Sequence, residues 1–297
     1  MQIESQLPLY IIVVFFNPTE EDIEYFRQLA TQYQGICVDN SSIPTFQQDS
    51  IGKMIYLACN KNLGIAEAQN IGIRHLMGEE GIVVFLDQDS RFPLDYPLLI
   101  AKEFQKYTAQ NIRLGIIGPT VVNIKDKQEY QSIIHKHHTI ADGLVVQREI
   151  ISSGACTSIS VLKQIGLNDA RLFIDYVDFD LCWRANANGY QCATTRSFRI
   201  MHQVGNKNIW IGKYLIIISS PFRYFYQYRN YLWLIRRNYV PLQWKIATGI
   251  KFIARLIYFP LLVKDGINCW KYMIKGIKSG IKQPKELKPD NSTDCIP

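Results

Sequence analysis

Short apolar runs alternate with segments of helical spacing through the N-terminal third of the chain. Runs of this kind, almost free of charge, are typical of strands in a sheet that is covered on both faces. The predicted strands are residues 9–16, 36–38, 53–58 and 82–86. Between them, Thr19 followed by Asp22 predicts a capped helix start, and residues 65–77 have a second helical pattern. This alternation predicts an α/β fold with right-handed βαβ units and a mainly parallel sheet.

The last of these strands ends directly at two aspartates, Asp87 and Asp89. A buried strand cannot hold an unpaired carboxylate, because burying a charge without a partner is too costly. Both residues are therefore expected at the carboxyl edge of the sheet, where open α/β sheets bind ligands. Two carboxylates one residue apart can share a hard divalent cation whose remaining ligands are substrate phosphates. A turn that uses Asp and Ser only as turn-forming residues is the alternative explanation.

Polar loops follow the other predicted strands as well. Asp39 comes after the second strand, and Asn62, Leu63 and Gly64 follow the third. The carboxyl ends of parallel strands meet at one edge of a sheet, so these loops are expected to lie together. Such a gathering of polar loops is a geometry typical of nucleotide sites.

The second half of the chain is less regular. Residues 129–143 are expected to form a polar loop or hairpin, which contains three histidines, His135, His137 and His138. No carboxylate or cysteine accompanies them at ligand spacing, so solvent-exposed histidines are favoured over a metal site. Residues 160–165 and 214–240 are expected to be helical. His202 lies in a Met-His-Gln-Val-Gly segment. It is interpreted either as a ligand of a metal or diphosphate or as a buried structural histidine.

Composition narrows the class of protein. With 47% hydrophobic and 20% charged residues, the chain is expected to be globular with a substantial core. Its seven cysteines form no CxxC pair, which indicates free thiols in a reducing compartment. The N-terminus lacks the basic segment of a signal peptide, and no charge-free stretch has the length of a membrane span. A cytoplasmic protein is therefore expected.

The net charge of +7 is concentrated in the tail. Residues 1–244 carry 23 basic against 22 acidic side chains, whereas residues 245–297 carry 10 against 4. This distribution argues against a nucleic-acid-binding protein, in which a folded face is basic. Apolar residues recur in the tail at helical spacing with lysines beside them: Val263, Ile267, Trp270, Ile274 and Ile277, with Lys264, Lys271, Lys275, Lys278 and Lys282. Such a helix suits an anionic bilayer interface, or it packs on the body with a solvated lysine face. A further amphipathic stretch covers residues 244–258.

Taken in order, six segments resemble the family 2 inverting glycosyltransferases of the GT-A fold, a Rossmann-like mainly parallel sheet flanked by helices. Within that family, the chain most resembles bacterial rhamnosyltransferases that use dTDP-rhamnose. The Asp-Gln-Asp-Ser form of the aspartate motif favours rhamnose as the sugar. The segments are residues 11–18 (IIVVFFNP), 38–42 (VDNSS), 62–72 (NLGIAEAQNIG), 85–90 (FLDQDS), 173–190 (FIDYVDFDLCWRANANGY) and 223–230 (RYFYQYRN).

The resemblance implies how the polar loops bind a nucleotide sugar. Asp39 is expected to accept the ring N3–H of uracil or thymine. The loop of Asn62 and Gly64 is expected to let backbone approach the nucleotide, since Gly64 has no Cβ. Asp87 would contact the ribose or the metal through water, and Asp89 would ligate Mg²⁺ or Mn²⁺. His202 is similar to the histidine that many GT-A enzymes bring to the metal or diphosphate.

The resemblance also implies a general base in the acidic cluster of Asp175, Asp178 and Asp180. Inverting transfer needs a base for the acceptor hydroxyl, and burial or like charges can raise a carboxylate pKa for this task. If residues 172–187 are partly helical, Asp175 and Asp178 are neighbours on one helix face. Asp178 matches the family's base position, with Asp175 as its rival. A cluster that only stabilises the helix N-terminus is the alternative.

Together these inferences predict a hexosyltransferase of bacterial surface polysaccharide synthesis, such as O-antigen synthesis. It would move L-rhamnose from dTDP-rhamnose to a glycan or lipid-linked acceptor on the cytoplasmic face of the inner membrane. A UDP-sugar donor, an inactive nucleotide-sugar-binding or scaffolding homologue, and a membrane-bound interaction module are the alternatives. The expected organisation is a catalytic domain over residues 1–210, with a nucleotide-sugar half over about 1–90 and an acceptor half over about 91–210. An aromatic, basic helical segment (211–240) packed on that domain and a basic amphipathic tail (241–297) would follow.

Overall fold

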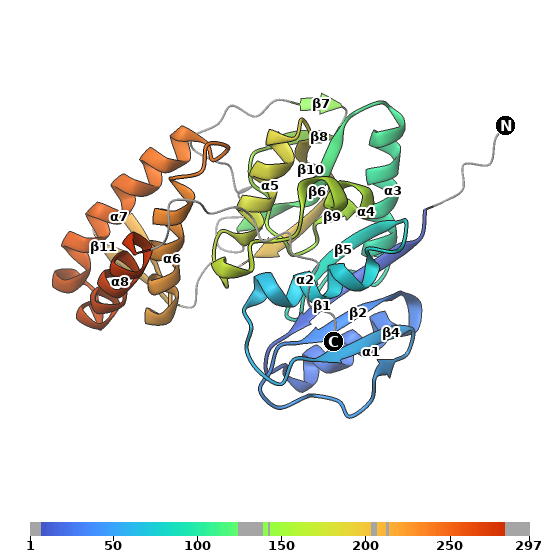
Figure 1. The fold of residues 1–297 in the computed structure, drawn as a ribbon, viewed down its shortest axis with the longest axis horizontal. Helices are drawn as coiled ribbons and strands as arrows, with labels where there is room; N and C mark the ends of the chain where they lie inside the picture. The colour runs from blue at the N-terminus through green and yellow to red at the C-terminus, as the bar shows by residue number, and fades with distance from the viewer. Residues whose placement is uncertain (1–6, 124–138, 142, 203–206, 212–213, 283–297) are drawn as a thin grey trace.

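The computed structural model describes residues 7–123, 139–141, 143–202, 207–211 and 214–282 (Figure 1). In this part of the chain, ten strands form one sheet in the order β3-β4-β2-β1-β5-β9-β6-β10-β8-β7. Their bounds are β1 Leu9–Phe15, β2 Gln34–Asp39, β3 Ser50–Ile51, β4 Met54–Ala58, β5 Ile82–Asp87, β6 Leu114–Asn123, β7 Thr139–Ala141, β8 Leu144–Gln147, β9 Cys156–Ser158 and β10 Gln191–His202. A separate hairpin pairs β11 Lys207–Ile211 with β12 Tyr214–Ile218.

The four predicted N-terminal strands are confirmed as the parallel neighbours β4, β2, β1 and β5. Beyond β5 the sheet is mixed, because β9 runs antiparallel between β5 and β6, while β6 and β10 are parallel to each other. The interior positions of β1 and β5 are buried throughout, as expected for strands covered on both faces. The sequence therefore predicted the parallel N-terminal half of the sheet well and its mixed half poorly.

Helices cover both faces of the sheet. Their bounds are α1 Glu20–Gln32, α2 Ile65–Leu76, α3 Tyr96–Ala109, α4 Ile159–Ile165, α5 Val177–Ala187, α6 Pro221–Leu234, α7 Leu242–Leu262 and α8 Gly266–Ile281. One hydrophobic core lies between the sheet and α1 and α3, and a second lies between the sheet and α2, α4 and α5. The predicted capping box of α1 is present, since Thr19 and Asp22 exchange hydrogen bonds with each other's backbone N–H.

Residues 172–187 are partly helical, as considered, but the consequence drawn for the acidic cluster was wrong. Helix α5 begins only at Val177, because Phe173, Asp175 and Tyr176 have φ values of 63°, 67° and 67°. Asp175 and Asp178 are therefore not neighbours on one helix face. The segment expected to be helical over residues 214–240 begins with strand β12, and α6 starts at Pro221, a favoured first helical residue.

Helices α6, α7 and α8 form a group beside the sheet, coloured orange to red in Figure 1. They share a core of aromatic and aliphatic side chains that includes Tyr228, Phe252, Phe259 and Met273. The glycines of α8 permit close packing, since a Cβ at Gly276 would lie 2.4 Å from the carbonyl oxygen of Phe225 in α6. A second cluster joins this group to α2 and α5: Ala66, Leu172, Val177, Trp183, Trp233, Leu234, Val240 and Trp244.

The basic tail is thus ordered by protein packing as far as residue 282. Val263 is buried, Ile274 and Ile277 are half-buried, and Ile267 and Trp270 are exposed. In the described part of the chain, no helix is both long and apolar enough to cross a bilayer. The six cysteines within that part are free thiols, as predicted.

Candidate functional site

A cavity of about 1040 Å³ lies where the carboxyl ends of the parallel strands face α5, α6 and α7. Its described lining contains five carboxylates and two guanidinium groups: Asp87, Asp89, Glu149, Asp175 and Asp178, with Arg196 and Arg223. The cavity is therefore negatively charged, although the chain as a whole carries a net charge of +7. An anionic ligand would need a cation to bind in such a cavity.

Asp87 is the last residue of β5 and Asp89 lies on the turn that follows it, at the edge of the sheet where both were predicted. The side chain of Gln88 between them accepts a hydrogen bond of 2.7 Å from the backbone N–H of Phe16, which fixes the turn to the end of β1. Burial, together with the negative charges of Asp89 and Asp178, raises the pKa of Asp87 to about 7. This electrostatic coupling shows that carboxylates from separate elements converge in one place.

Asp178 stands in the first turn of α5 and lines the cavity. Its Oδ1 accepts a hydrogen bond of 3.0 Å from the backbone N–H of Phe179. Burial raises the pKa of Asp178 to about 6, partly opposed by backbone hydrogen bonds and assisted by the charge of Asp175. A carboxylate with this pKa is ionised at neutral pH and still basic enough to take a proton from a hydroxyl group.

Asp175 also lines the cavity, but its carboxylate is engaged. Arg223 of α6 donates from Nε to Oδ2 at 3.2 Å and from its terminal nitrogen to Oδ1 at 2.5 Å. A bidentate pair of this kind stabilises the ionised carboxylate and occupies both of its oxygens. Of the two candidate bases, Asp175 is paired with an arginine, whereas the described hydrogen bonds to Asp178 come from backbone N–H groups.

The third aspartate of the cluster, Asp180, is fully buried and belongs to a structural network. It accepts hydrogen bonds from Arg184 at 3.0 Å, Arg237 at 2.6 Å and Tyr239 at 2.8 Å. Arg237 also pairs with the buried Asp169. The network connects α5 to the segment between α6 and α7, so it fixes the helix of Asp178 to the C-terminal helices.

The loop that carries Asp175 is held by one buried side chain of α6. The amide of Asn230 donates to the carbonyl oxygens of Leu172, Ile174 and Asp175 at 2.9, 2.8 and 3.1 Å. Left-handed residues are costly unless their surroundings fix them. Asn230 satisfies the carbonyl groups of this left-handed loop and thereby supports the position of Asp175 beside Arg223.

The loops that were predicted to contact the nucleotide lie at the same edge of the sheet, but they differ in how far they are exposed to the cavity. Asn62 and Gly64 line the cavity, and the Asn62 side chain accepts from Asn40 at 3.0 Å and from the Gly64 N–H at 2.9 Å. Gly64 has a φ of 82°, and a Cβ there would lie 2.6 Å from the ring of Phe173. The space left by its missing side chain is thus taken by the acidic-cluster loop, not only kept free for a ligand.

Asp39 is fully buried and is not among the residues that line the cavity. Its carboxylate accepts from the N–H groups of Ser41 and Thr45 at 2.9 and 2.8 Å and from the hydroxyl of Tyr56 at 2.6 Å. Burial favours the neutral acid, but these hydrogen bonds outweigh it and the net pKa of Asp39 is lowered. In this structure Asp39 holds the loop after β2 in place.

The negative charge at the sheet edge that carries Asp87 and Asp89 suits the binding of a divalent cation. Among the described residues, no three or more His, Cys, Asp and Glu side chains are arranged as a complete metal site. Mg²⁺ commonly takes only one or two carboxylates, with phosphate oxygens and water as its other ligands, and Asp87 with Asp89 fits that pattern. His202 is the last residue of β10, and its side chain, like His135, His137 and His138, lies outside the described residues.

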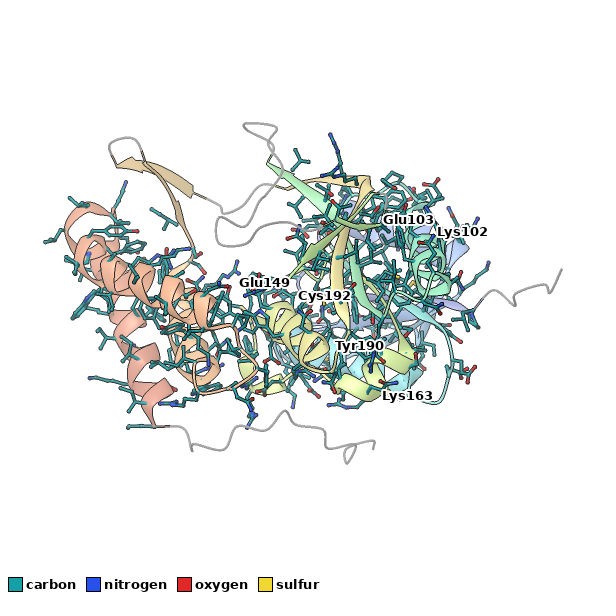
Figure 2. All side chains as sticks on the ribbon, turned by 90° about the horizontal axis from the view of Figure 1, so that it is seen from above. Lys102, Glu103, Glu149, Lys163, Tyr190 and Cys192 are labelled. Carbon is teal, nitrogen blue, oxygen red and sulfur yellow. The ribbon has the colours of Figure 1, made fainter. Side chains whose placement is uncertain are left out.

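Three charged cavity residues were missed by the sequence analysis: Glu149, Arg196 and Arg223. Glu149 is half-buried, accepts a hydrogen bond of 2.8 Å from the indole of Trp183, and has a pKa raised by burial. Figure 2 shows Glu149 at the junction between the sheet and the C-terminal helices. Glu149 follows a segment without clear hydrophobic periodicity, so the sequence did not indicate a functional residue there. Arg223 begins the RYFYQYRN segment, but nothing in the sequence indicated that it pairs with Asp175.

Comparisons with known proteins identify the family of the chain. Residues 10–164 match the model of the family Glycosyl transferase family 2. The chain is 31% identical over 287 residues to the dTDP-rhamnosyl transferase RfbF of Shigella flexneri, covering 91% of this chain and 93% of that protein.

Solved structures with little sequence identity share the fold. TarS of S. aureus has a TM-score of 0.55 at 15% identity, over 91% of this chain and 49% of TarS. The structure of GalNAc-T7 with UDP, GalNAc and Mn²⁺ has a TM-score of 0.52 at 12% identity, over 91% of this chain and 55% of that one. The chain thus spans about half the length of these two structures. It is an α/β glycosyltransferase with the GT-A fold and belongs to glycosyl transferase family 2.

Proposed function

We propose that the protein is an inverting rhamnosyltransferase that uses dTDP-rhamnose and acts on a glycan or lipid-linked acceptor in bacterial surface polysaccharide synthesis. The observation that carries the proposal is the convergence of Asp87, Asp89 and Asp178 on one cavity, with the charges of two of them raising the pKa of the third. The choice of donor is supported by the 31% identity to a dTDP-rhamnosyl transferase over most of both chains.

In this proposal Asp178 is the general base. It removes the proton of the acceptor hydroxyl while the hydroxyl oxygen attacks C1 of the sugar and the bond from C1 to the diphosphate oxygen breaks. The attack comes from the face opposite the diphosphate, so the configuration at C1 inverts. The pKa of about 6 keeps Asp178 ionised at neutral pH, and general-base catalysis of this kind contributes about 10²–10⁴-fold in rate. Asp175, paired with Arg223, positions the wall of the cavity beside the base.

Asp89 and Asp87 would hold Mg²⁺ or Mn²⁺, with His202 as a further ligand. A bound cation neutralises the negative charge that develops on the leaving nucleoside diphosphate. The chain's own residues supply the turn that presents both carboxylates, fixed to β1 through Gln88. Asn62 and Gly64 would contact the nucleotide. Asp39 would contribute by ordering the loop beside the nucleobase, or by accepting its N3–H after that loop has opened.

The organisation of the chain is proposed as a catalytic domain over residues 1–210, a helical segment over 211–240 and a tail over 241–297. We place the protein in the cytoplasm, on the inner face of the bacterial membrane, where lipid-linked acceptors are carried. The helical segment and the tail would then lie on the acceptor side, since Phe222, Arg223 and Trp244 line the cavity.

A thermal-shift panel tests the donor and the metal together. We expect dTDP and dTDP-rhamnose to raise the melting temperature in the presence of Mg²⁺ or Mn²⁺, because a ligand of the native state stabilises it by mass action. Asp89→Ala should abolish the shift, and the exposed Glu80→Ala should keep it as a matched control. A shift with UDP ligands alone would overturn the choice of donor, and no shift with any nucleotide would favour a scaffolding homologue.

A transfer assay tests the base. Asp178→Asn should keep the nucleotide shift and lose sugar transfer to a lipid extract by about 10²-fold or more. Retention of transfer within a few-fold of wild type would refute the assignment of Asp178. A larger loss of transfer in Asp175→Asn than in Asp178→Asn would move the assignment to Asp175.

A further inference from the structure

The most exposed apolar surface of the described chain lies on α7. Seven aliphatic side chains of this helix are between 55% and 77% exposed, and Leu262 is one of them. The other six are Leu242, Ile246, Ile250, Ile253, Ile257 and Leu261. At about 100° per residue they fall within an arc of about 100°. Trp244, Phe252 and Phe259 occupy the opposite side of α7 and are buried in the molecule. Water-exposed branched aliphatic residues in an unbroken stripe of this length are typical of an interaction surface.

We propose that this α7 stripe, defined by the six residues above, is the surface with which the protein lies on an anionic lipid bilayer. The proposal deepens the proposed function, on which it rests for the idea of a lipid-linked acceptor. It also differs from the expectation drawn from the sequence, which placed the membrane contact on the stripe of residues 263–277. That stripe is partly buried, because α8 packs against α6 through its glycines.

The net charge of the C-terminal helices, of which the stripe is a part, favours an anionic surface. Asp265 is the single acidic residue between positions 181 and 282. The lysines of α8 and its flanks are exposed to solvent: Lys264, Lys271, Lys275, Lys278 and Lys282. Basic residues close to an anionic leaflet are attracted to it electrostatically and strengthen binding. A second copy of the chain would bring the same positive charge against itself, so a symmetric dimer through this surface is opposed by repulsion.

The geometry of α7 fits a helix that lies in the interface. The helix carries Lys245, Lys251 and Arg255 along its 21 residues, and an interfacial helix inserts only its apolar face. Arg255 is buried and stacks near the rings of Tyr224 and Phe252, so it does not interrupt the stripe.

The stripe begins beside the cavity. Leu242, its first residue, is 70% exposed, and Trp244 two residues later lines the cavity. Phe222 and Arg223 at the start of α6 line the same wall. A bilayer bound along α7 would therefore lie next to the cavity, so that an acceptor anchored in the membrane could reach Asp178 without leaving the lipid surface.

Vesicle sedimentation with the full chain tests the proposal. We expect the protein to sediment with vesicles of phosphatidylcholine and phosphatidylglycerol, and much less with phosphatidylcholine alone. The triple variant Ile250→Ser, Ile253→Ser, Ile257→Ser should lose at least about tenfold in affinity for the anionic vesicles. The matched control carries Ile43→Ser, Ile55→Ser and Leu98→Ser, which replaces exposed aliphatic residues elsewhere and should bind as the wild type does.

Three results would overturn the inference. They are a wild type that stays in solution with anionic vesicles, a stripe variant that binds equally well, and a wild-type dimer that becomes monomeric in the stripe variant by light scattering. Circular dichroism and the nucleotide thermal shift of the stripe variant show that its fold and donor site are intact. Because the nucleotide shift needs no membrane, its absence in the wild type would refute the proposed function, while vesicle binding would still decide this inference.

Discussion

Replacing the proposed base should make the protein more stable while it abolishes transfer. The folded state raises the pKa of Asp178 from its ordinary value of 3.8 to about 6, chiefly through burial. The unfolded chain binds protons with the ordinary pKa, so the ionised carboxylate destabilises the folded state at neutral pH. Asp178→Asn removes this charge and keeps an oxygen that can accept the hydrogen bond from the N–H of Phe179. The variant should therefore have a larger free energy of unfolding.

The magnitude follows from linkage between protonation and folding. One unit of pKa difference corresponds to about 1.4 kcal/mol, so the cost of the ionised group is about 3 kcal/mol at pH 7.5 and about 1 kcal/mol at pH 4.5. The folded pKa lies above the unfolded one, so the cost is absent well below the unfolded pKa. It grows as the pH rises between the two values and is constant above the folded pKa of about 6. The stabilisation in Asp178→Asn should follow the same curve.

Urea denaturation of wild type and Asp178→Asn at both pH values, with chelator and without nucleotide, measures the difference. Asp180→Asn is the matched control in the same helix, and it should destabilise the protein at both pH values because it breaks the buried arginine network. The reasoning fails if Asp178→Asn is no more stable than wild type at pH 7.5. It fails equally if the gain has the same size at both pH values.

The remaining predictions concern the supports of the site. Asp180→Asn should lower the free energy of unfolding by about 3–5 kcal/mol, since removal of one partner leaves buried guanidinium charge uncompensated; an unchanged urea midpoint would contradict this. Asn230→Ala should cost about 2–4 kcal/mol and reduce transfer, because three carbonyl groups of the left-handed loop lose their donor. If the variant had the stability and kcat of the wild type, the loop would keep its conformation without Asn230, and this prediction would be wrong. Gly64→Ala should lower stability by about 1–3 kcal/mol in the same urea assay, because a Cβ would meet Phe173 at a positive φ. An unchanged midpoint would mean that the loop adjusts without strain.

The sequence predicted those parts of the fold that are set by local periodicity. Strands β1, β2, β4 and β5 are apolar runs, and the cap of α1 depends on two residues three positions apart. Strand β9, which inserts antiparallel between β5 and β6, has a register fixed only by distant partners and could not be predicted locally. The same distinction applies to the site. Asp87 and Asp89 were placed correctly because a strand end is a local feature, whereas the contribution of Glu149 depends on contacts made only in the fold.

The acidic cluster shows why a count of carboxylates in sequence does not reveal their chemistry. Asp175, Asp178 and Asp180 lie within six residues, yet the structure gives each a different partner: Arg223, a backbone N–H and a pair of buried arginines. The difference arises from the left-handed residues before α5, which turn Asp175 away from the helix face it was expected to share with Asp178. Asp180 then anchors the helix by ion pairing. This anchoring holds Asp178 in a cavity that already carries the charges of Asp87 and Asp89. Its raised pKa there is maintained at a cost in the stability of the fold.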